Sequence, residues 1–372
     1  MKKIAITGTG LFTPAESISN DELVASFNAY VEAHNAEHRI DIAAGRREAL
    51  VPSSSDFIVK ASGIKSRYTV NKSGVLDIRS MRPQIAPRTD DQSSLMCDMG
   101  VAAAREALQS AGRSAADVDA VIVACSNLPR PYPALAVEIQ AALGVHGWAY
   151  DMNVACASAA FGVQAAADAI QRGSARGVLV ISPEICTGHL NFRNRDCHFI
   201  FGDAATAVLV EAGEGQAAGF EILGTRLRTQ FSNNIRNNFG FLNPGEIPAR
   251  NWDDLLFKQE GRKVFKEVVP LVSEMIVKHL GDLGLQPQAV KRFWLHQANL
   301  SMNQLIARRV LGREPDAGEA PVILDEYANT SSAGSVIAFH KHHRDLRAGE
   351  LGVLCAFGAG YSAGSVVMRK LN

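Results

Sequence analysis

The sequence predicts an α/β protein made of two similar halves, and two observations support this prediction. Short apolar stretches typical of buried strands alternate along the chain with longer amphipathic or Ala-rich stretches typical of helices. The same order of signals also occurs twice, because Cys156 follows a helix-ending Gly112 at nearly the spacing at which Asn329 follows Gly284. A repeated order of this kind indicates an ancient duplication of one α/β unit.

The strands are predicted from short runs rich in Val, Ile, Leu and Ala. They cover residues 3–7, 120–124, 177–181, 205–211, 292–295 and 351–357, and a more polar strand-like stretch covers 148–153. Helices are predicted at residues 98–110, 156–172, 258–280, 302–311 and 332–344. This alternation favours layers of helices packed on sheets.

The two halves are predicted to meet at a polar, Gly-rich stretch, residues 211–215. This boundary gives an N-terminal half of residues 1–212 and a C-terminal half of residues 213–372. The two halves also share a short stretch of similar sequence, Val-Ala-Cys-Ala-Ser-Ala at 154–159 and Ala-Asn-Thr-Ser-Ser-Ala at 328–333. Residues 28–56 and 71–91 fit no regular pattern, and we expect both to be excursions over the surface.

The composition argues against several classes of protein. Lys and Arg number 38, as do Asp and Glu, so no overall field draws the chain to nucleic acid or to a membrane. No apolar stretch approaches the length of a membrane span. The six cysteines are scattered without a C-x-x-C pair, which indicates neither a metal site nor a disulfide framework and favours the cytoplasm. The Gly8-Thr9-Gly10 stretch lacks the third glycine of a dinucleotide loop, so we expect no nucleotide cofactor.

Cys156 is the first candidate functional residue. It lies where the stretch 148–153 gives way to the Ala-rich helix, so we expect the thiol in the first helical turn, beside unpaired N–H groups. Such a position lowers the pKa of a thiol and makes it a nucleophile. Taken alone, a Cys in an apolar stretch is more often a small core residue.

His296 and Asn329 are the second and third candidates. Alone, His296 is explained as a structural histidine at the end of a strand, and Asn329 as the N-cap of a helix. Their places in the duplicated pattern favour a different hypothesis. A thiol, an imidazole and an amide would converge from the two halves, as nucleophilic catalysis requires.

The ordered set of motifs resembles the thiolase superfamily, and within it the β-ketoacyl-acyl-carrier-protein synthase III group. Members of this group have a Cys at the start of a buried helix, a His-Gln-Ala-Asn segment, an Asn-Thr-Ser segment and a terminal Phe-Gly-x-Gly loop. These are Cys156 and residues 296–299, 329–331 and 357–360 in this chain. Residues 201–203 (Phe-Gly-Asp) and 261–266 (Gly-Arg-Lys-Val-Phe-Lys) are similar to further signatures of the family. The resemblance implies a five-layered αβαβα thiolase-like fold and a homodimer.

The resemblance also implies a decarboxylating Claisen condensation in fatty acid or related polyketide-type biosynthesis. Cys156 would take an acyl group from an acyl-coenzyme A or acyl-carrier-protein thioester, while the backbone N–H groups of Cys156 and Ala359 bind the oxyanion. A malonyl thioester on acyl carrier protein would then lose CO2, with His296 and Asn329 as neutral donors to the enolate. The thioesters are substrates, and the reaction requires no metal or redox cofactor.

The terminal loop departs from the family in one position. Family members usually have Gly where this chain has Ala359, which keeps the N–H group but restricts the backbone. Gly358 and Gly360 on either side allow the backbone to approach a substrate closely, although a plain β-turn explains them equally well.

Other departures concern the substrate. In the family, a Trp and an Arg near the N-terminus enclose the adenine of coenzyme A, and the matching residues here are Phe57 and Ala61. Phe57 can still stack, but the sequence predicts that the planar guanidinium is missing. Tyr132 matches the interface aromatic that closes the acyl tunnel of the neighbouring subunit, and local packing in a turn is the alternative.

Carrier-protein docking rests on two arginines. Arg308 and Arg309 match a basic pair that faces acidic carrier proteins in the family, while Ser301 stands where an Arg is common. A solvated helix face explains the two arginines equally well.

Two rival functions are kept beside this one. A thiolase would use a second catalytic Cys in a C-x-G loop, but Cys355 stands in Cys-Ala-Phe-Gly, and a hydroxymethylglutaryl-coenzyme A synthase would favour a carboxylate base near the thiol. A non-catalytic partner subunit of a synthase pair would be expected to lose the nucleophile, and this chain keeps Cys156, His296 and Asn329.

Overall fold

The computed structural model describes residues 2–213, 218–243, 245 and 251–372. Its strands are β1 (Ile4–Phe12), β2 (Glu16–Ser19), β3 (Ser66–Thr69), β4 (Ala120–Ala124), β5 (Trp148–Met152), β6 (Gly177–Ile185), β7 (Asp203–Ala212), β8 (Phe220–Ser232), β9 (Ile235–Arg236), β10 (Lys258–Gln259), β11 (Val290–Leu295), β12 (Leu351–Gly358) and β13 (Gly360–Lys370). Its helices are α1 (Asn20–Glu37), α2 (Arg39–Ala43), α3 (Ser55–Ser62), α4 (Lys72–Leu76), α5 (Leu95–Ala111), α6 (Leu135–Leu143), α7 (Ser158–Arg172), α8 (Trp252–Leu255), α9 (Gly261–Asp282), α10 (Leu300–Leu311), α11 (Leu324–Tyr327) and α12 (Ala333–Lys341). Short 3₁₀ turns occur at Ala115–Asp117, Cys186–His189 and Pro287–Ala289.

The main strands repeat one topology. Strands of the N-terminal part lie in the order β5-β4-β6-β7-β1, with β4 parallel to β5 and β6, and β7 antiparallel to β6 and β1. Strands of the C-terminal part lie in the order β11-β12-β13-β8, with β11 parallel to β12, and β13 antiparallel to β12 and β8. The two groups are joined by a short pairing of β1 with β8. Duplication of one unit would leave this repeated order.

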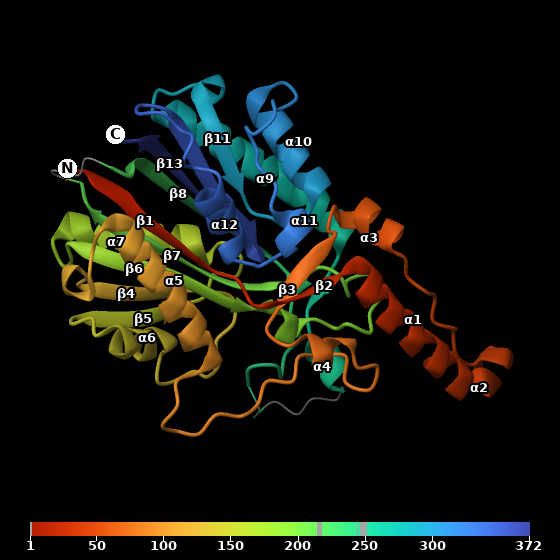
Figure 1. Ribbon diagram of the computed structural model, residues 1–372. Coiled ribbons are helices and arrows are strands. Elements are labelled where there is room, and N and C mark those ends of the chain that lie inside the picture. Colours follow the sequence, from red (N-terminus) through yellow and green to blue (C-terminus); the bar gives the residue numbers. More distant parts are fainter. Residues whose placement is uncertain (1, 214–217, 244, 246–250) are drawn as a thin grey trace.

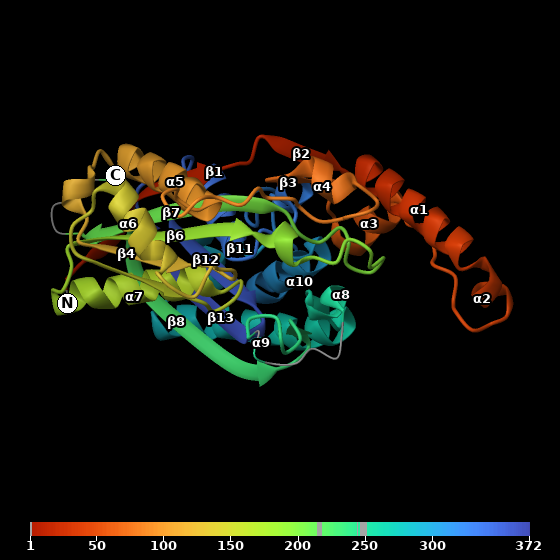
Figure 2. The same cartoon turned by 90° about the horizontal axis from the view of Figure 1, so that it is seen from below.

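The elements are arranged in five layers. Helices α7 and α12 share one core with β4 and β6 on one side and with β11, β12 and β13 on the other, so they form the middle layer. Helices α5 and α6 cover the outer face of the N-terminal strands, and α9 and α10 cover the outer face of the C-terminal strands. Figure 2 shows α5 and α6 on the opposite side of the molecule from α9.

Small side chains let α7 lie between the two groups of strands. Six of its eight buried positions are Ala, Gly or Ser, and a Cβ added at Gly162 would lie 2.6 Å from Val180 and 2.9 Å from the Ala124 Cβ. The backbone of α7 is therefore in close contact with β4 and β6 at Gly162. This contact fixes the position of the helix that follows Cys156.

The predicted strands all form, whereas several helix predictions need correction. Lys258 and Gln259 pair with β9 as strand β10, and α9 begins only at Gly261. Residues 28–43 were expected to be irregular, but α1 and α2 occupy most of them. Leu23, Phe27 and Val31 of α1 are buried at helical spacing, and a capping box between Ser19 and Glu22 begins the helix. Figure 1 shows α1 and α2 projecting from the rest of the molecule.

Residues 71–91 agree with the prediction except for the short helix α4. Within the described ranges, no helix is both long enough and apolar enough to cross a lipid bilayer. The same residues contain no group of three or more His, Cys, Asp and Glu side chains placed to bind a metal ion.

Candidate active site

Cys156 lies in a tight turn between β5 and α7. The preceding Ala155 has a φ of 48°, and the Ser158 hydroxyl accepts a hydrogen bond from the Val154 N–H at 2.8 Å. Helix α7 begins at Ser158, with Ala157 as its N-cap, so the predicted start at Cys156 is two residues early. The thiol therefore precedes the helix rather than belonging to its first turn.

The expected lowering of the thiol pKa is also wrong for this structure. Burial raises the pKa of Cys156 to about 11, and the Glu184 carboxylate acts in the same direction. The Ser331 hydroxyl and the backbone N–H groups of Cys156 and Ala359 act in the opposite direction, because they donate to the sulfur. Desolvation outweighs these donors, so the resting thiol is neutral.

His296 and Asn329 line the same cavity as Cys156, which has a volume of about 1050 Å³. His296 follows β11, its N–H donates to the Cys355 carbonyl at 2.8 Å, and its ring packs edge-on against Phe357. Burial lowers the pKa of His296 to about 4, so the imidazole is neutral at physiological pH. The cavity therefore brings together a neutral thiol, a neutral imidazole and an amide.

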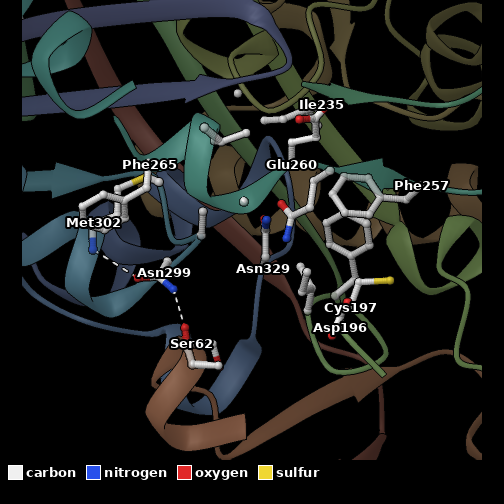
Figure 3. Close-up of a pocket in the computed structure, with 18 of the residues that line it drawn as sticks. Ser62, Asp196, Cys197, Ile235, Phe257, Glu260, Phe265, Asn299, Met302 and Asn329 are labelled. Carbon is white, nitrogen blue, oxygen red and sulfur yellow. Dashed lines mark hydrogen bonds between the residues drawn. The ribbon is translucent and has the colours of Figure 1, made fainter. Parts of the chain in front are cut away.

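Asn329 is held by the backbone around it. Its N–H donates to the Ile200 carbonyl at 2.9 Å, and its side-chain Oδ1 accepts from the Ser331 N–H at 2.9 Å. The amide nitrogen is left to donate within the cavity, where Figure 3 shows Asn329 between Asn299 on one side and Phe257 on the other. Since α12 begins at Ala333, Asn329 does not occupy the helix start that the duplicated spacing predicts.

The terminal loop lies directly against the nucleophile. A Cβ added at Gly358 would lie 2.6 Å from the Cys156 Cβ and 2.9 Å from its Sγ, so only Gly fits there. Ala359 does not adopt a positive φ, and its N–H acts on the Cys156 sulfur, so the Ala that departs from the family causes no strain. The positive φ of the loop falls on Gly360, at 131°, and Gly360 lines neither cavity.

A guanidinium is present beside Phe57 after all. The Arg195 Cζ lies 4.0 Å from the centre of the Phe57 ring, and Phe199 packs edge-on against the same ring. Both Phe57 and Ala61 line the large cavity, and the Ala61 carbonyl accepts a hydrogen bond from Asn299. The Arg that the family has at position 61 is replaced by Ala61, and the loop 190–202 instead places the guanidinium of Arg195 against Phe57, although Arg195 lines neither cavity.

A second cavity, of about 860 Å³, also reaches Cys156. Its lining includes the apolar residues Leu128, Pro129, Pro131, Phe201, Phe239 and Phe241, of which Phe239 is largely exposed. Cys156 thus stands where the two cavities meet. Tyr132 is 81% exposed and lines neither of them, and its predicted contact with a second subunit stays a prediction.

Arg308 and Arg309 lie on exposed positions of α10, the helix whose Met302 lines the large cavity. Arg308 pairs with Glu314 at 3.1 Å, which reduces the charge that it offers to a partner. Arg262, which the sequence analysis did not single out as a site residue, lines the large cavity. Its place in the Gly-Arg-Lys-Val-Phe-Lys segment is the signal that could have identified it.

Two observations bear on the rival functions. Cys355 is fully buried in β12 and lines neither cavity, so it is not placed as a second catalytic thiol. Glu184 is a carboxylate near Cys156, as a hydroxymethylglutaryl-type enzyme would favour. However, it is fully buried, lines neither cavity, and both of its oxygens accept hydrogen bonds from Ser126 and Ser332. It is not free to act as a base.

Comparison with known proteins identifies the family. Two family models match, 3-oxoacyl-[acyl-carrier-protein] synthase III at residues 150–230 and its C-terminal part at residues 280–370. A β-ketodecanoyl-[acyl-carrier-protein] synthase of Pseudomonas aeruginosa is 63% identical over 93% of this chain and 99% of that protein. The chain belongs to the 3-oxoacyl-acyl-carrier-protein synthase III family. A synthase III of Agrobacterium fabrum is 32% identical over 87% of this chain and 93% of that protein.

Solved structures agree with this membership. A 3-oxoacyl-acyl-carrier-protein synthase III of Pseudomonas aeruginosa is 25% identical, covers 100% of this chain and 99% of its own, and gives a TM-score of 0.76. The enzyme of the same description from Aquifex aeolicus gives a TM-score of 0.77 at 24% identity, over 98% of this chain and 99% of its own. The predicted thiolase-like fold and the predicted synthase III class of acyltransferase are confirmed.

Proposed function

We propose that this synthase condenses a medium-chain acyl thioester with malonyl-acyl carrier protein through an acyl intermediate on Cys156. The observation that carries the proposal is the position of Cys156 at the meeting point of two cavities, one of which also contains His296 and Asn329. One cavity can admit the carrier arm of a thioester while the other receives the acyl chain.

In the first half-reaction, the Cys156 thiol loses its proton and its sulfur attacks the thioester carbon of the primer. A C–S bond to Cys156 forms, the C–S bond to the carrier breaks, and the leaving thiolate takes up a proton. The N–H groups of Cys156 and Ala359, which act on the sulfur in the resting state, are placed to donate to the carbonyl oxygen of the tetrahedral intermediate.

In the second half-reaction, the malonyl thioester loses CO2 and becomes an enolate. His296 and Asn329 suit this step, because a neutral imidazole and an amide can donate to the enolate oxygen without acting as a base. The enolate carbon then attacks the acyl group on Cys156, and the C–S bond breaks to return the thiolate and release the β-ketoacyl product.

The length of the primer is proposed from the second cavity and from a relative. The name of the Pseudomonas enzyme, β-ketodecanoyl synthase, denotes a ten-carbon product, which a two-carbon extension makes from an eight-carbon primer. The apolar walls of the 860 Å³ cavity fit an alkyl chain that leads away from Cys156. We therefore assign an eight-carbon acyl group to this cavity.

The carriers and setting complete the proposal. Phe57, which lines the large cavity and has Arg195 against one face of its ring, suits the adenine of coenzyme A, and Arg309 with Arg262 suits an acidic carrier protein. A homodimer, the cytoplasm and the absence of any metal or redox cofactor belong to the same proposal. The absence of a disulfide among the cysteines of the structure supports the cytoplasm.

Intact-mass analysis against a panel of acyl donors tests the proposal. The protein is incubated with acyl-coenzyme A and acyl-carrier-protein donors of increasing length, and malonyl carrier protein is then added. We expect an adduct on Cys156 that forms fastest with eight-carbon donors and is lost as a β-ketoacyl product. Equal acylation of Cys156→Ala would show that the nucleophile is assigned wrongly.

A further inference from the structure

Ser331 touches the reacting atom of the site, and the condensation steps above give it no role. Its Oγ lies 3.3 Å from the Cys156 Sγ and donates to it. The side chain is buried, and it lines the second cavity beside Ala359. No other side-chain hydroxyl among the described residues is hydrogen-bonded to this sulfur.

The backbone at Ser331 is held in an unusual conformation. Its φ is 50°, a left-handed value that non-glycine residues adopt only where the surroundings impose it. Asn329 imposes it from one side, because its Oδ1 accepts the Ser331 N–H at 2.9 Å. A strained residue that aims a hydroxyl at a nucleophile is typical of a functional site.

Glu184 holds Ser332, the residue that follows Ser331. Its carboxylate accepts from the N–H and hydroxyl of Ser332 in the C-terminal part, and from the N–H and hydroxyl of Ser126 in the N-terminal part. Asn127 is a further donor. Burial raises the pKa of Glu184, and the hydrogen bonds from Ser126 and Ser332 act in the opposite direction. These hydrogen bonds tie the segment that carries Ser331 to the end of β4.

The other groups around the thiol provide no positive charge. His296 is neutral, Glu184 can carry only a negative charge, and the nearby Cys186 thiol has a pKa raised by burial. A thiolate at Cys156 must therefore be stabilised by neutral donors, and a hydroxyl donating to a charged acceptor is among the stronger of these.

We propose that Ser331 is a further catalytic residue, whose hydroxyl stabilises the Cys156 thiolate during acylation, and that Glu184 is the positioning residue that aims it. This proposal rests on the proposed function, since it assigns a role only if Cys156 is the nucleophile. Ser331 then supplies to the thiolate what a cationic histidine supplies in other cysteine enzymes.

The test is the pH profile of Cys156 alkylation by iodoacetamide, followed by peptide mass analysis. Ser331→Gly removes the hydroxyl and accepts the positive φ without strain, so it should fold as the wild type does. Ser331→Ala removes the hydroxyl and keeps the Cβ. Ser335→Ala is the matched control, because Ser335 is a buried serine of α12 whose hydroxyl has no hydrogen-bond partner among the described residues.

Both Ser331 variants should raise the thiol pKa by about one unit and slow acylation by about tenfold, as loss of one hydrogen bond to a charge does. Ser335→Ala should leave the profile unchanged. A profile of Ser331→Gly that matches the wild type overturns the proposal, whatever happens to turnover. Failure of the wild-type Cys156 to accept any acyl donor would instead overturn the proposed function, and the two failures are read from separate measurements.

Glu184→Gln tests the positioning role by the sign of its effect. Loss of the negative charge by itself would lower the thiol pKa, since Glu184 raises it in the structure. A rise in the thiol pKa therefore reports that Ser331 is no longer aimed at the sulfur. A fall, or no change, shows that Glu184 acts through its charge or not at all.

Discussion

The guanidinium of Arg195 covers one face of the Phe57 ring, with its Cζ 4.0 Å from the ring centre. The two residues lie 138 positions apart in the sequence, counted as 195 minus 57. A hydrogen bond between the Arg195 Nε and the Pro52 carbonyl, at 2.8 Å, orients the guanidinium. Phe57 lines the large cavity, where the carrier arm of a thioester is proposed to enter, and Arg195 supports the Phe57 ring without lining the cavity itself.

Arg195→Ala should weaken the use of coenzyme A donors specifically. We expect KM for octanoyl-coenzyme A to rise about three- to tenfold with kcat nearly unchanged, which is the size of one cation–π contact. Octanoyl-carrier protein, which has no adenine, should show no such change. The control is Arg193→Ala, since Arg193 packs on Tyr30 and pairs with Asp253, and neither of these partners lines a cavity, whereas Phe57 does. Equal changes in KM for both donors would contradict the assignment.

Gly358→Ala should abolish most acylation. The added Cβ would lie 2.6 Å from the Cys156 Cβ, so either the terminal loop or the nucleophile must move. We expect acylation to slow at least about tenfold and stability to fall by about 1–3 kcal/mol, as overpacking does. The control is Gly281→Ala in α9, where nothing lies within 4 Å of the new Cβ. The acylation rate and the thermal melting temperature are measured for both variants. Normal acylation of Gly358→Ala would argue against the observed loop position.

His296→Gln should flatten the acid limb of the stability curve. A histidine in the unfolded chain binds a proton below its ordinary pKa of 6.5, whereas folded His296 stays neutral down to about 4. Between pH 4 and 6.5 the unfolded state therefore binds more protons than the folded state. The free energy of unfolding keeps its full contribution from His296 above pH 6.5, and it loses roughly 3 kcal/mol of this contribution as the pH falls to 4.

Urea unfolding at several pH values measures this loss. Between pH 6.5 and 4, the wild type should lose stability more steeply than His296→Gln. An exposed histidine on the surface, His146, provides the control, and His146→Gln should follow the wild type. Identical slopes for wild type and His296→Gln would show that the imidazole is not neutral in the folded protein.

Local sequence patterns predicted much of the fold. The strands β1, β4, β5, β6, β7, β11 and β12 and the helices α5, α7 and α10 form close to their predicted ranges, because apolar runs and Ala-rich helices are local signals. Strand β8 escaped prediction because only one of its 13 residues is buried and its polar residues show no clear alternation. Helix α1 was missed although its capping box and its buried Leu23, Phe27 and Val31 are visible in the sequence.

The sequence likewise predicted some features of the site and not others. The ordered motifs were sufficient to bring Cys156, His296 and Asn329 to one cavity. Arg195 could not be found from the sequence, because its contact with Phe57 depends on the path of the loop 190–202. The thiol pKa was predicted in the wrong direction, because the helix dipole is a local effect whereas burial depends on the whole fold.

Separation of the two half-reactions tests the central claim most directly. His296→Ala and Asn329→Ala are first acylated on Cys156 with octanoyl-coenzyme A, as followed by intact mass. CO2 release from carboxyl-labelled malonyl carrier protein is then measured. We predict near-normal acylation of both variants and a loss of decarboxylation of about a hundredfold or more, the size of one lost transition-state donor. Undiminished CO2 release from both variants would remove His296 and Asn329 from the mechanism.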